Sequence, residues 1–373
     1  SSFLPSAIAL DLAAGKVYWS ETFDGRVQRS NLNGSNVELI TNQPAVPLGL
    51  AIDGTVGRLY WSDASLKMIR RSEMDGSNAQ TLLARNLAFL EGMALDTMNG
   101  KIYWIDAGTN KIQRANIDAT GIEDLVSGLS APYRIALDLA AGKMYWTEQN
   151  PRSITRANLD GSGAEVLLTL ANAPLSIALD TGTGKMYWHE FDVIRRANFD
   201  GSTIETLASE YTAGITLDLS AGKLYWSGNF SVRRSNLDGS SPENVVFNHP
   251  DVFFPEDLLI DSEGGKVYWA DWARFDFDFP KIQRANLDGS NVEDVVVDDI
   301  SAFVPRALAI APQPIEGDID GDLDVDLDDA DALVAVLLGA PLQLIHVPRA
   351  DLNLDSISDG RDVKGFVTAL LAW

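Results

Sequence analysis

Two twelve-residue segments near the C-terminal end of the sequence, residues 318–329 and 351–362, place oxygen-bearing groups at alternate positions. Oxygen ligands at loop positions 1, 3, 5, 7, 9 and 12 suit calcium, whose shell of about six to eight oxygens tolerates flexible geometry. The expected ligands are Asp318, Asp320, Asp322, the carbonyl of Asp324, Asp326 and Asp329, then Asp351, Asn353, Asp355, the carbonyl of Ile357, Asp359 and Asp362. The spacing therefore predicts two calcium ions.

The residues around these loops predict a helix on one side only. Prolines precede each loop, at positions 312 and 314 and again at 341 and 348, and they disfavour an entering helix. After the loops, residues 329–339 and 362–373 have the apolar spacing of amphipathic helices. An acidic run alone is usually a solvated surface, but two matching loops with helices behind them favour a metal site.

This duplicated loop–helix arrangement resembles a type I dockerin domain, a module of secreted bacterial proteins. The resemblance covers residues 313–373 and implies calcium-dependent folding and a cohesin-type protein partner. In dockerins, loop positions 10 and 11 often face the cohesin, and the matching residues are Leu327, Asp328, Gly360 and Arg361. The sequence departs from the usual loop at position 6, where Leu323 and Ser356 stand in place of glycine.

The rest of the chain repeats one pattern seven times, centred on a Tyr-Trp pair. The pairs begin at residues 18, 60, 103, 145, 187, 225 and 268. An apolar run ending in Asp precedes each pair, and two further short runs follow it, separated in most copies by Asn-Gly or Asp-Gly turns. Four short strands in a period of about 40 to 45 residues are typical of propeller blades. We therefore predict an all-β propeller of four-stranded blades, with seven blades favoured and six as the alternative, followed by a small α-helical loop–helix calcium module.

The copies "YWSD" at 60–63, "YWTE" at 145–148 and "YWAD" at 268–271 resemble the YWTD repeats of the LDL-receptor class of β-propellers. The resemblance covers about residues 3–310. It implies a non-enzymatic, extracellular propeller used for protein–protein contacts, usually with six blades. The sequence departs from the family in having seven copies and in lacking the cysteine-rich EGF-like neighbours, since it contains no cysteine.

The ends of the repeat region bear on ring closure. Residues 304–312 have the pattern of an eighth first strand, although the chain already begins with a complete one. Propellers are usually closed by a blade built from both termini, so one end strand would be surplus in a ring of seven. We favour an edge strand or linker at 304–312, and the alternative is strand addition to a neighbouring molecule. The domains are expected at residues 1–312 and 313–373.

The composition disfavours several classes of function. The net charge of −24 disfavours nucleic acid and anionic membranes as partners. No apolar run reaches the roughly 18 residues that a membrane span needs, and the absence of cysteine excludes disulfides and thiolate metal sites. The three histidines, at 189, 249 and 346, share no metal-ligand spacing. We assign no catalytic residue and no cofactor besides calcium.

Features that recur in most or all copies predict a scaffold. The Tyr-Trp pairs are expected to pack between blades. A carboxylate two positions after Trp, and an arginine ten positions after it in the first four copies, are expected to link strands within or between blades; these arginines are Arg29, Arg71, Arg114 and Arg156.

Three features break the repeat and are therefore candidates for individual functions. They are His189 in "YWHE", Gly228 in "YWSG", and an extended loop that follows Trp269. The extended loop carries Trp272, Phe275, Phe277 and Phe279, which are candidate contacts for a protein or a carbohydrate. The alternative is that these aromatic residues pack over the propeller or against the tail.

The sequence thus favours a secreted, bacterial, non-enzymatic protein for binding or assembly, whose signal peptide has been removed. The propeller would present loops to a protein, and the tail would bind a cohesin-like protein or support self-association. One alternative is a calcium-assisted propeller enzyme of the lactonase or lyase type that carries a dockerin. Another is a subunit of an extracellular filament joined by strand exchange.

Overall fold

The computed structural model describes residues 5–21, 25–41, 47–54, 56–84, 90–272 and 281–297. The chain divides into two compact units, Ser1–Asp298 and Asp299–Trp373, and all described residues belong to the first. The expected boundary after residue 312, the strand at 304–312, the calcium loops and both helices lie outside the described residues. Within the described part of the chain, no helix is long and apolar enough to cross a membrane.

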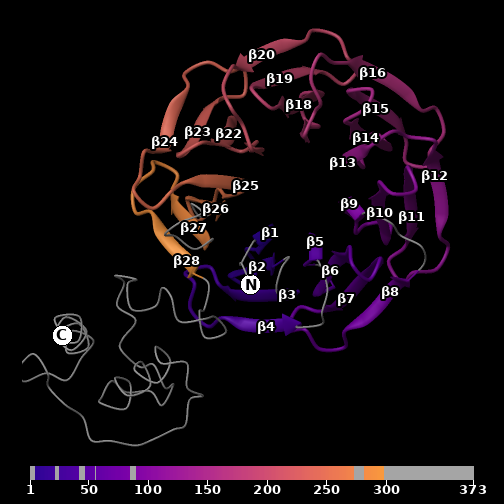
Figure 1. The fold of residues 1–373 in the computed structure, drawn as a ribbon, viewed down its shortest axis with the longest axis horizontal. Helices are drawn as coiled ribbons and strands as arrows, with labels where there is room; N and C mark the ends of the chain where they lie inside the picture. The colour runs from indigo at the N-terminus through magenta and orange to yellow at the C-terminus, as the bar shows by residue number, and fades with distance from the viewer. Residues whose placement is uncertain are drawn as a thin grey trace, which may run out of the picture. The chain divides into compact units, whose positions relative to one another are not determined.

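Seven four-stranded antiparallel sheets are arranged around a ring (Figure 1). Each sheet, or blade, consists of four strands that are consecutive in the sequence, from β1–β4 in blade 1 to β25–β28 in blade 7. The seven Tyr-Trp copies therefore correspond to seven blades. The prediction of a seven-bladed propeller is confirmed, and the alternative of six blades is wrong.

Within each blade, the first strand lies innermost and the fourth lies at the outside of the ring (Figure 1). The innermost strands are β1 (Pro5–Asp11), β5 (Pro47–Asp53), β9 (Leu90–Asp96), β13 (Pro132–Asp138), β17 (Ser176–Asp180), β21 (Gly214–Asp218) and β25 (Phe254–Asp261). The second strands are β2 (Lys16–Glu21), β6 (Arg58–Asp63), β10 (Lys101–Asp106), β14 (Lys143–Glu148), β18 (Lys185–Glu190), β22 (Lys223–Gly228) and β26 (Lys266–Trp272). The third strands are β3 (Arg26–Asn31), β7 (Met68–Glu73), β11 (Lys111–Asn116), β15 (Ser153–Asn158), β19 (Val193–Asn198), β23 (Ser231–Asn236) and β27 (Lys281–Asn286). The outermost strands are β4 (Glu38–Thr41), β8 (Gln80–Ala84), β12 (Glu123–Ser127), β16 (Glu165–Thr169), β20 (Glu205–Ala208), β24 (Glu243–Phe247) and β28 (Glu293–Val297).

The turns between strands follow from the residues at the strand ends. The aspartate that ends each innermost strand accepts a backbone N–H three residues further on, which closes the first hairpin. In the third hairpin of blade 4, the Asp160 carboxylate accepts the N–H of Ser162 at 2.9 Å, and Gly161 has a φ of 83°. A Cβ on Gly161 would overlap the carbonyl oxygen of Leu125 in blade 3. The Asp-Gly-Ser turn therefore reverses the chain and also lets neighbouring blades approach closely.

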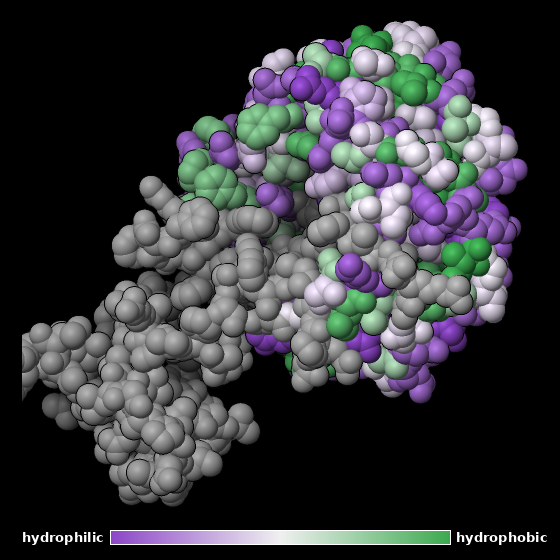
Figure 2. Space-filling view, turned by 45° about the vertical axis from the view of Figure 1, so that its right-hand side comes forward, coloured by the Kyte–Doolittle hydropathy of each residue, from purple (hydrophilic) through white to green (hydrophobic). Residues whose placement is uncertain are grey.

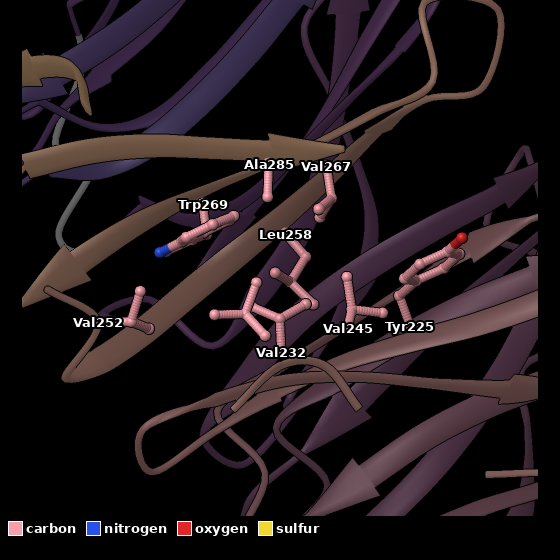
Figure 3. Packing of buried hydrophobic residues seen from close by; sticks show 9 residues of the cluster. Tyr225, Val232, Val245, Val252, Leu258, Val267, Trp269 and Ala285 are labelled. Carbon is pink, nitrogen blue, oxygen red and sulfur yellow. The ribbon is translucent and has the colours of Figure 1, made fainter. Parts of the chain in front are cut away.

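The repeated Tyr-Trp pairs fill the interfaces between blades. All seven pairs are at most 2% exposed, and the two rings of a pair point to opposite faces of the sheet because side chains alternate along a strand. Figure 3 shows the interface of blades 6 and 7, where Tyr225, Val245, Leu258 and Trp269 belong to one buried cluster. Burial of each large ring contributes on the order of 2–3 kcal/mol. The expected scaffold role of these pairs is confirmed.

An arginine on the third strand of each blade ties that blade to the next. Arg156 donates to the carbonyl oxygen of Phe199 in blade 5 at 2.8 Å, and it pairs with Glu165 on the adjacent β16. Equivalent bonds of 2.6–2.9 Å run from Arg29, Arg71, Arg114, Arg196, Arg234 and Arg284 to the carbonyl oxygens of Met74, Ile117, Leu159, Leu237, Leu287 and Leu32. The arginines therefore link strands as expected. In six blades the carboxylate partner is a glutamate that begins the outermost strand, and in blade 2 the neutral Gln80 stands there beside Arg71.

The ring closes without a shared blade among the described residues. Blades 1 and 7 each contain four consecutive strands of their own. Trp19 of blade 1 packs in one cluster with Tyr268 of blade 7, and Arg284 of blade 7 donates to the carbonyl oxygen of Leu32 in blade 1 at 2.7 Å. The seam between the two end blades thus uses the same contacts as the other interfaces.

Candidate interaction face

Most sequence-predicted site residues lie outside the described part of the chain. These are the twelve calcium ligands, the four dockerin-type contact positions and the three phenylalanines Phe275, Phe277 and Phe279. Trp272 is the last residue of β26, and its backbone pairs with Phe254 in β25, so the extended loop leaves blade 7 beside Phe254. Among the described residues, no group of three or more His, Asp or Glu could hold a metal ion.

The three exceptions to the repeat occupy the same place in three consecutive blades. His189, Gly228 and Trp272, after which the extended loop begins, all belong to the C-terminal end of a second strand, in blades 5, 6 and 7. In an antiparallel blade, this strand end lies on the side that carries the second hairpin and the connection to the next blade. We call this side of the ring the connection face. The fold therefore gathers all three exceptions in one sector of one face.

Blades 5 and 6 have shortened second hairpins, and each hairpin places a phenylalanine on the connection face. Phe191 and Asp192 form the two-residue turn between β18 and β19, and Asn229 and Phe230 form the turn between β22 and β23. Blades 1 to 4 use four residues for the same turn. Phe191 is 62% exposed and Phe230 is 39% exposed, so two large apolar side chains stand in solvent.

Each of these phenylalanines meets an aromatic residue of the connection that leads to the next blade. Phe191 contacts Tyr211 edge to face, with ring centroids 4.9 Å apart. Phe230 contacts Phe253 at 6.2 Å and Phe254 at 5.8 Å, and its N–H donates to the carbonyl oxygen of Phe253 at 2.9 Å. We call these five residues the aromatic strip. Figure 2 shows hydrophobic residues gathered beside a hollow in the face of the ring that it displays.

The presence of glycine at position 228 is explained by the connection between blades 5 and 6, which carries Tyr211. A Cβ on Gly228 would lie 2.7 Å from the carbonyl oxygen of Tyr211, so glycine lets this connection lie close to β22. In blades 1, 4 and 5, the tryptophan indole donates to the glutamate two positions on, at 2.9–3.3 Å. In blade 6 that partner is Glu210 of the connection, which accepts from Trp226 at 2.8 Å and pairs with Arg233. The exception thus positions Tyr211 in the aromatic strip.

His189 is a buried residue beneath this face. Its side chain is 1% exposed, and Nδ1 lies 3.3 Å from the carbonyl oxygen of Glu190. Burial lowers the pKa of His189 to about 4, and the positive charge of Arg134 acts in the same direction. The ring is therefore neutral near pH 7. At the equivalent position in blade 4, Thr147 accepts the backbone N–H of Arg134 at 3.1 Å, which shows that this position supports the start of an innermost strand.

Asp271 holds the last part of the aromatic strip. Its carboxylate accepts the backbone N–H groups of Phe253 and Phe254, both at 3.0 Å. Burial raises the pKa of Asp271 to about 6, although these hydrogen bonds and Lys281 act in the opposite direction. Because Asp271 directly precedes Trp272, one residue joins the aromatic strip to the start of the extended loop.

A family model described as "Low-density lipoprotein receptor repeat class B" matches residues 57–97 and 265–310. Both segments contain a Tyr-Trp copy together with strands of blades 2, 3 and 7. The chain thus carries YWTD-type LDL-receptor class B repeats in a seven-bladed β-propeller. No curated protein matches the sequence significantly.

Solved structures with similar folds include a chain of a nidogen/laminin complex and two structures of virginiamycin B lyase from Staphylococcus aureus. The nidogen/laminin chain is 24% identical with a TM-score of 0.52, and the match covers 63% of this chain and 93% of that chain. An inactive lyase with quinupristin is 19% identical with a TM-score of 0.61, covering 72% of this chain and 92% of that chain. The second lyase structure is also 19% identical, with a TM-score of 0.58 and coverage of 72% and 91%. At these identities, the likeness shows the fold.

Proposed function

We propose that this protein is a non-enzymatic binding scaffold that works outside the cell. Its propeller presents the aromatic strip to a protein partner, and its C-terminal dockerin-like module binds a second protein in the presence of calcium. The observation that carries the proposal is the clustering of exposed aromatic residues where the repeat is broken. Scaffold features recur in every blade, whereas a binding site must be individual, and the individual features lie together on the connection face.

The energetics of the strip support this proposal. A solvent-exposed phenylalanine gains on the order of 2 kcal/mol when a partner buries it, and aromatic residues are enriched at the centres of protein interfaces. The strip is also rigid, because Gly228, Glu210 and Asp271 fix the connections that carry its rings. A pre-organised surface binds without first losing conformational entropy. The nidogen/laminin complex is an example of a related fold in a protein complex.

The test uses matched variants with substitutions on opposite faces of the ring. The double variant Phe191→Ser, Phe230→Ser removes the exposed ends of the strip. The control Leu139→Ser, Leu219→Ser removes side chains of 37% and 48% exposure from the turns that follow two innermost strands, on the other face. Both variants and the wild type are exposed to the proteins secreted by the source organism. Retained proteins are then identified, purified and titrated.

The expected result is one protein that binds the wild type and the leucine variant at one site and loses affinity for the phenylalanine variant. Equal binding by the phenylalanine variant, or no protein that binds after purification, would overturn the proposal. Turnover of a small-molecule substrate by the wild type would instead favour the alternative, a calcium-assisted lyase or lactonase.

The proposed calcium site rests on the chemistry of its donors. The ligand set of residues 318–329 and 351–362 consists of carboxylates, one amide and two carbonyls, which are ligands that calcium prefers. Without a cation, the aspartates of each loop repel one another, so we expect the tail to fold when calcium binds. Chelation should expose residues 313–373 to protease and leave residues 5–297 protected. A tail whose proteolysis and hydrogen exchange do not change on chelation would contradict the proposal.

A further inference from the structure

The aromatic strip extends across three blades as two similar steps. In each step, a phenylalanine of a shortened hairpin contacts an aromatic residue of the connection to the next blade, at centroid distances of 4.9 to 6.2 Å. Because blades 5, 6 and 7 are successive and the carbonyl oxygen of Tyr211 lies against Gly228, the two groups of rings are neighbours on the connection face. Two neighbouring groups of rings in successive blades suit an extended segment of polypeptide better than a compact small molecule.

The charged groups of the same turns and connections are mainly carboxylates. Asp192 adjoins Phe191 and is exposed, and Asp251 lies in the connection that leads to Phe253, with its side chain 61% exposed. Burial raises the pKa of Tyr211, and the negative charge of the nearby Glu256 acts in the same direction. The charge along the strip is therefore predominantly negative.

Two described arginines on the third strands of blades 5 and 6 are already engaged by carboxylates. Arg195 pairs with Glu190 at 3.1 Å, and Arg233 pairs with Glu210 beneath the connection of blade 6. Arg233 also lies over the ring of Trp226, 5.6 Å from its centroid. Their positive charges are thus compensated inside the propeller and do not offset the carboxylates of the strip.

Aromatic faces and carboxylates attract the same kind of group, because the ring quadrupole and the carboxylate both favour a cation. We propose that the aromatic strip binds an extended segment of a partner protein that carries lysine or arginine side chains next to apolar ones. The apolar side chains pack on Phe191 and Phe230, and the cations lie beside Asp192 and Asp251. This inference rests on the proposed function and specifies the chemistry of the partner.

Charge also favours this partner over two other segments that could bind the aromatic strip. A second copy of this chain carries a net charge of −24, and residues 316–373 of the same chain contain 13 acidic and 3 basic residues. Both would bring negative charge to a negatively charged surface. A basic segment of another protein is the occupant with complementary charge.

The test is a selection of random twelve-residue displayed peptides on the full-length protein in calcium. Enriched peptides are then synthesised and titrated by fluorescence anisotropy against the wild type and two variants. The variant Phe191→Ser, Phe230→Ser changes the strip without changing the net charge, so general attraction of basic peptides to an acidic protein stays the same. The variant Asp192→Asn, Asp251→Asn keeps the rings and removes two charges.

The expected peptides combine lysine or arginine with aliphatic or aromatic residues. Their affinity should fall about tenfold or more in the phenylalanine variant, and several-fold both in the asparagine variant and when salt rises from 50 to 500 mM. Enriched peptides without basic residues, or equal affinity for the phenylalanine variant, would overturn this inference. If the secreted-protein experiment still yields a strip-dependent partner, the proposed function stands while the basic character of the segment is refuted.

Discussion

Replacing His189 with glutamine tests whether burial holds this side chain neutral. The pKa of His189 is lowered from 6.5 to about 4, so the folded protein resists protonation of the ring while the unfolded chain accepts it. A histidine whose pKa is lower in the folded protein than in the unfolded chain destabilises the fold as the pH falls below the pKa of the unfolded chain. The stability attributable to the neutral ring is therefore complete above about pH 6.5 and is lost progressively towards pH 4.

The magnitude follows from the size of the shift. Each pKa unit corresponds to about 1.4 kcal/mol, so the full effect at low pH is about 3 kcal/mol. At pH 5, where the unfolded histidine is almost fully protonated and the folded one almost neutral, the linkage relation gives about 2 kcal/mol. Glutamine has a similar volume, can still donate to the Glu190 carbonyl oxygen and does not titrate. His189→Gln should therefore lose about 2 kcal/mol less stability than the wild type between pH 7.5 and pH 5.

The measurement is urea unfolding followed by tryptophan fluorescence at pH 7.5, 6 and 5, at constant ionic strength and calcium concentration. Subtracting the free energy of unfolding of one protein from that of the other at each pH removes the contributions of all other titrating groups. Glutamine fits the site if the two proteins are within about 1 kcal/mol of each other at pH 7.5. Equal loss of stability by both proteins at pH 5 would refute the reasoning, because it would mean that the histidine is protonated in the fold.

Three further predictions concern the scaffold. Gly161→Ala should destabilise the protein by about 2 kcal/mol more than Gly142→Ala in thermal or urea unfolding. Both glycines have positive φ, but only a Cβ at position 161 would meet a neighbouring blade. Equal effects of the two substitutions would contradict the close approach of blades. The Asp271→Asn variant should become more stable relative to the wild type as the pH rises from 4 to 7, by up to about 3 kcal/mol. The wild type loses stability over this range because the pKa of Asp271 is raised to about 6, so the charged carboxylate is costly in the fold. Urea titrations that show no pH-dependent difference between the two proteins would disprove this. Trp146→Ala should cost about 3–5 kcal/mol, since the ring is 1% exposed, and an unchanged melting temperature would be inconsistent with its place in the core.

The architecture could be predicted from the sequence because its determinants are local and repeated. The Tyr-Trp spacing predicted the number of blades, and the Asp-Gly turns predicted the hairpins. The linking role of the arginines is predictable for the four that stand at the tenth position after tryptophan. Arg196, Arg234 and Arg284 have the same role, but they stand eight, eight and fifteen positions after tryptophan because the second hairpins of copies 5 to 7 differ in length.

The aromatic strip could not be predicted in the same way, because it depends on contacts between segments about twenty residues apart that only the ring brings together. Phe191 and Tyr211 have no common motif, and Glu210 replaces a carboxylate that the repeat places elsewhere. A partial signal was present in the shortened hairpins of copies 5 and 6, each of which contains a phenylalanine. Gly228 was recognised as an exception, but its physical reason lies in the carbonyl oxygen of Tyr211.

The ring closure has a consequence for how such a chain can change in evolution. Every blade in the described part of the chain is one uninterrupted stretch of sequence, and the seam between blades 7 and 1 uses the same arginine–carbonyl bond as the other interfaces. A gene duplication or deletion of one repeat would therefore add or remove a whole sheet without cutting one in two. The number of blades is then limited by the angle at which neighbouring sheets pack, and one blade can change its hairpins without altering the strands of another.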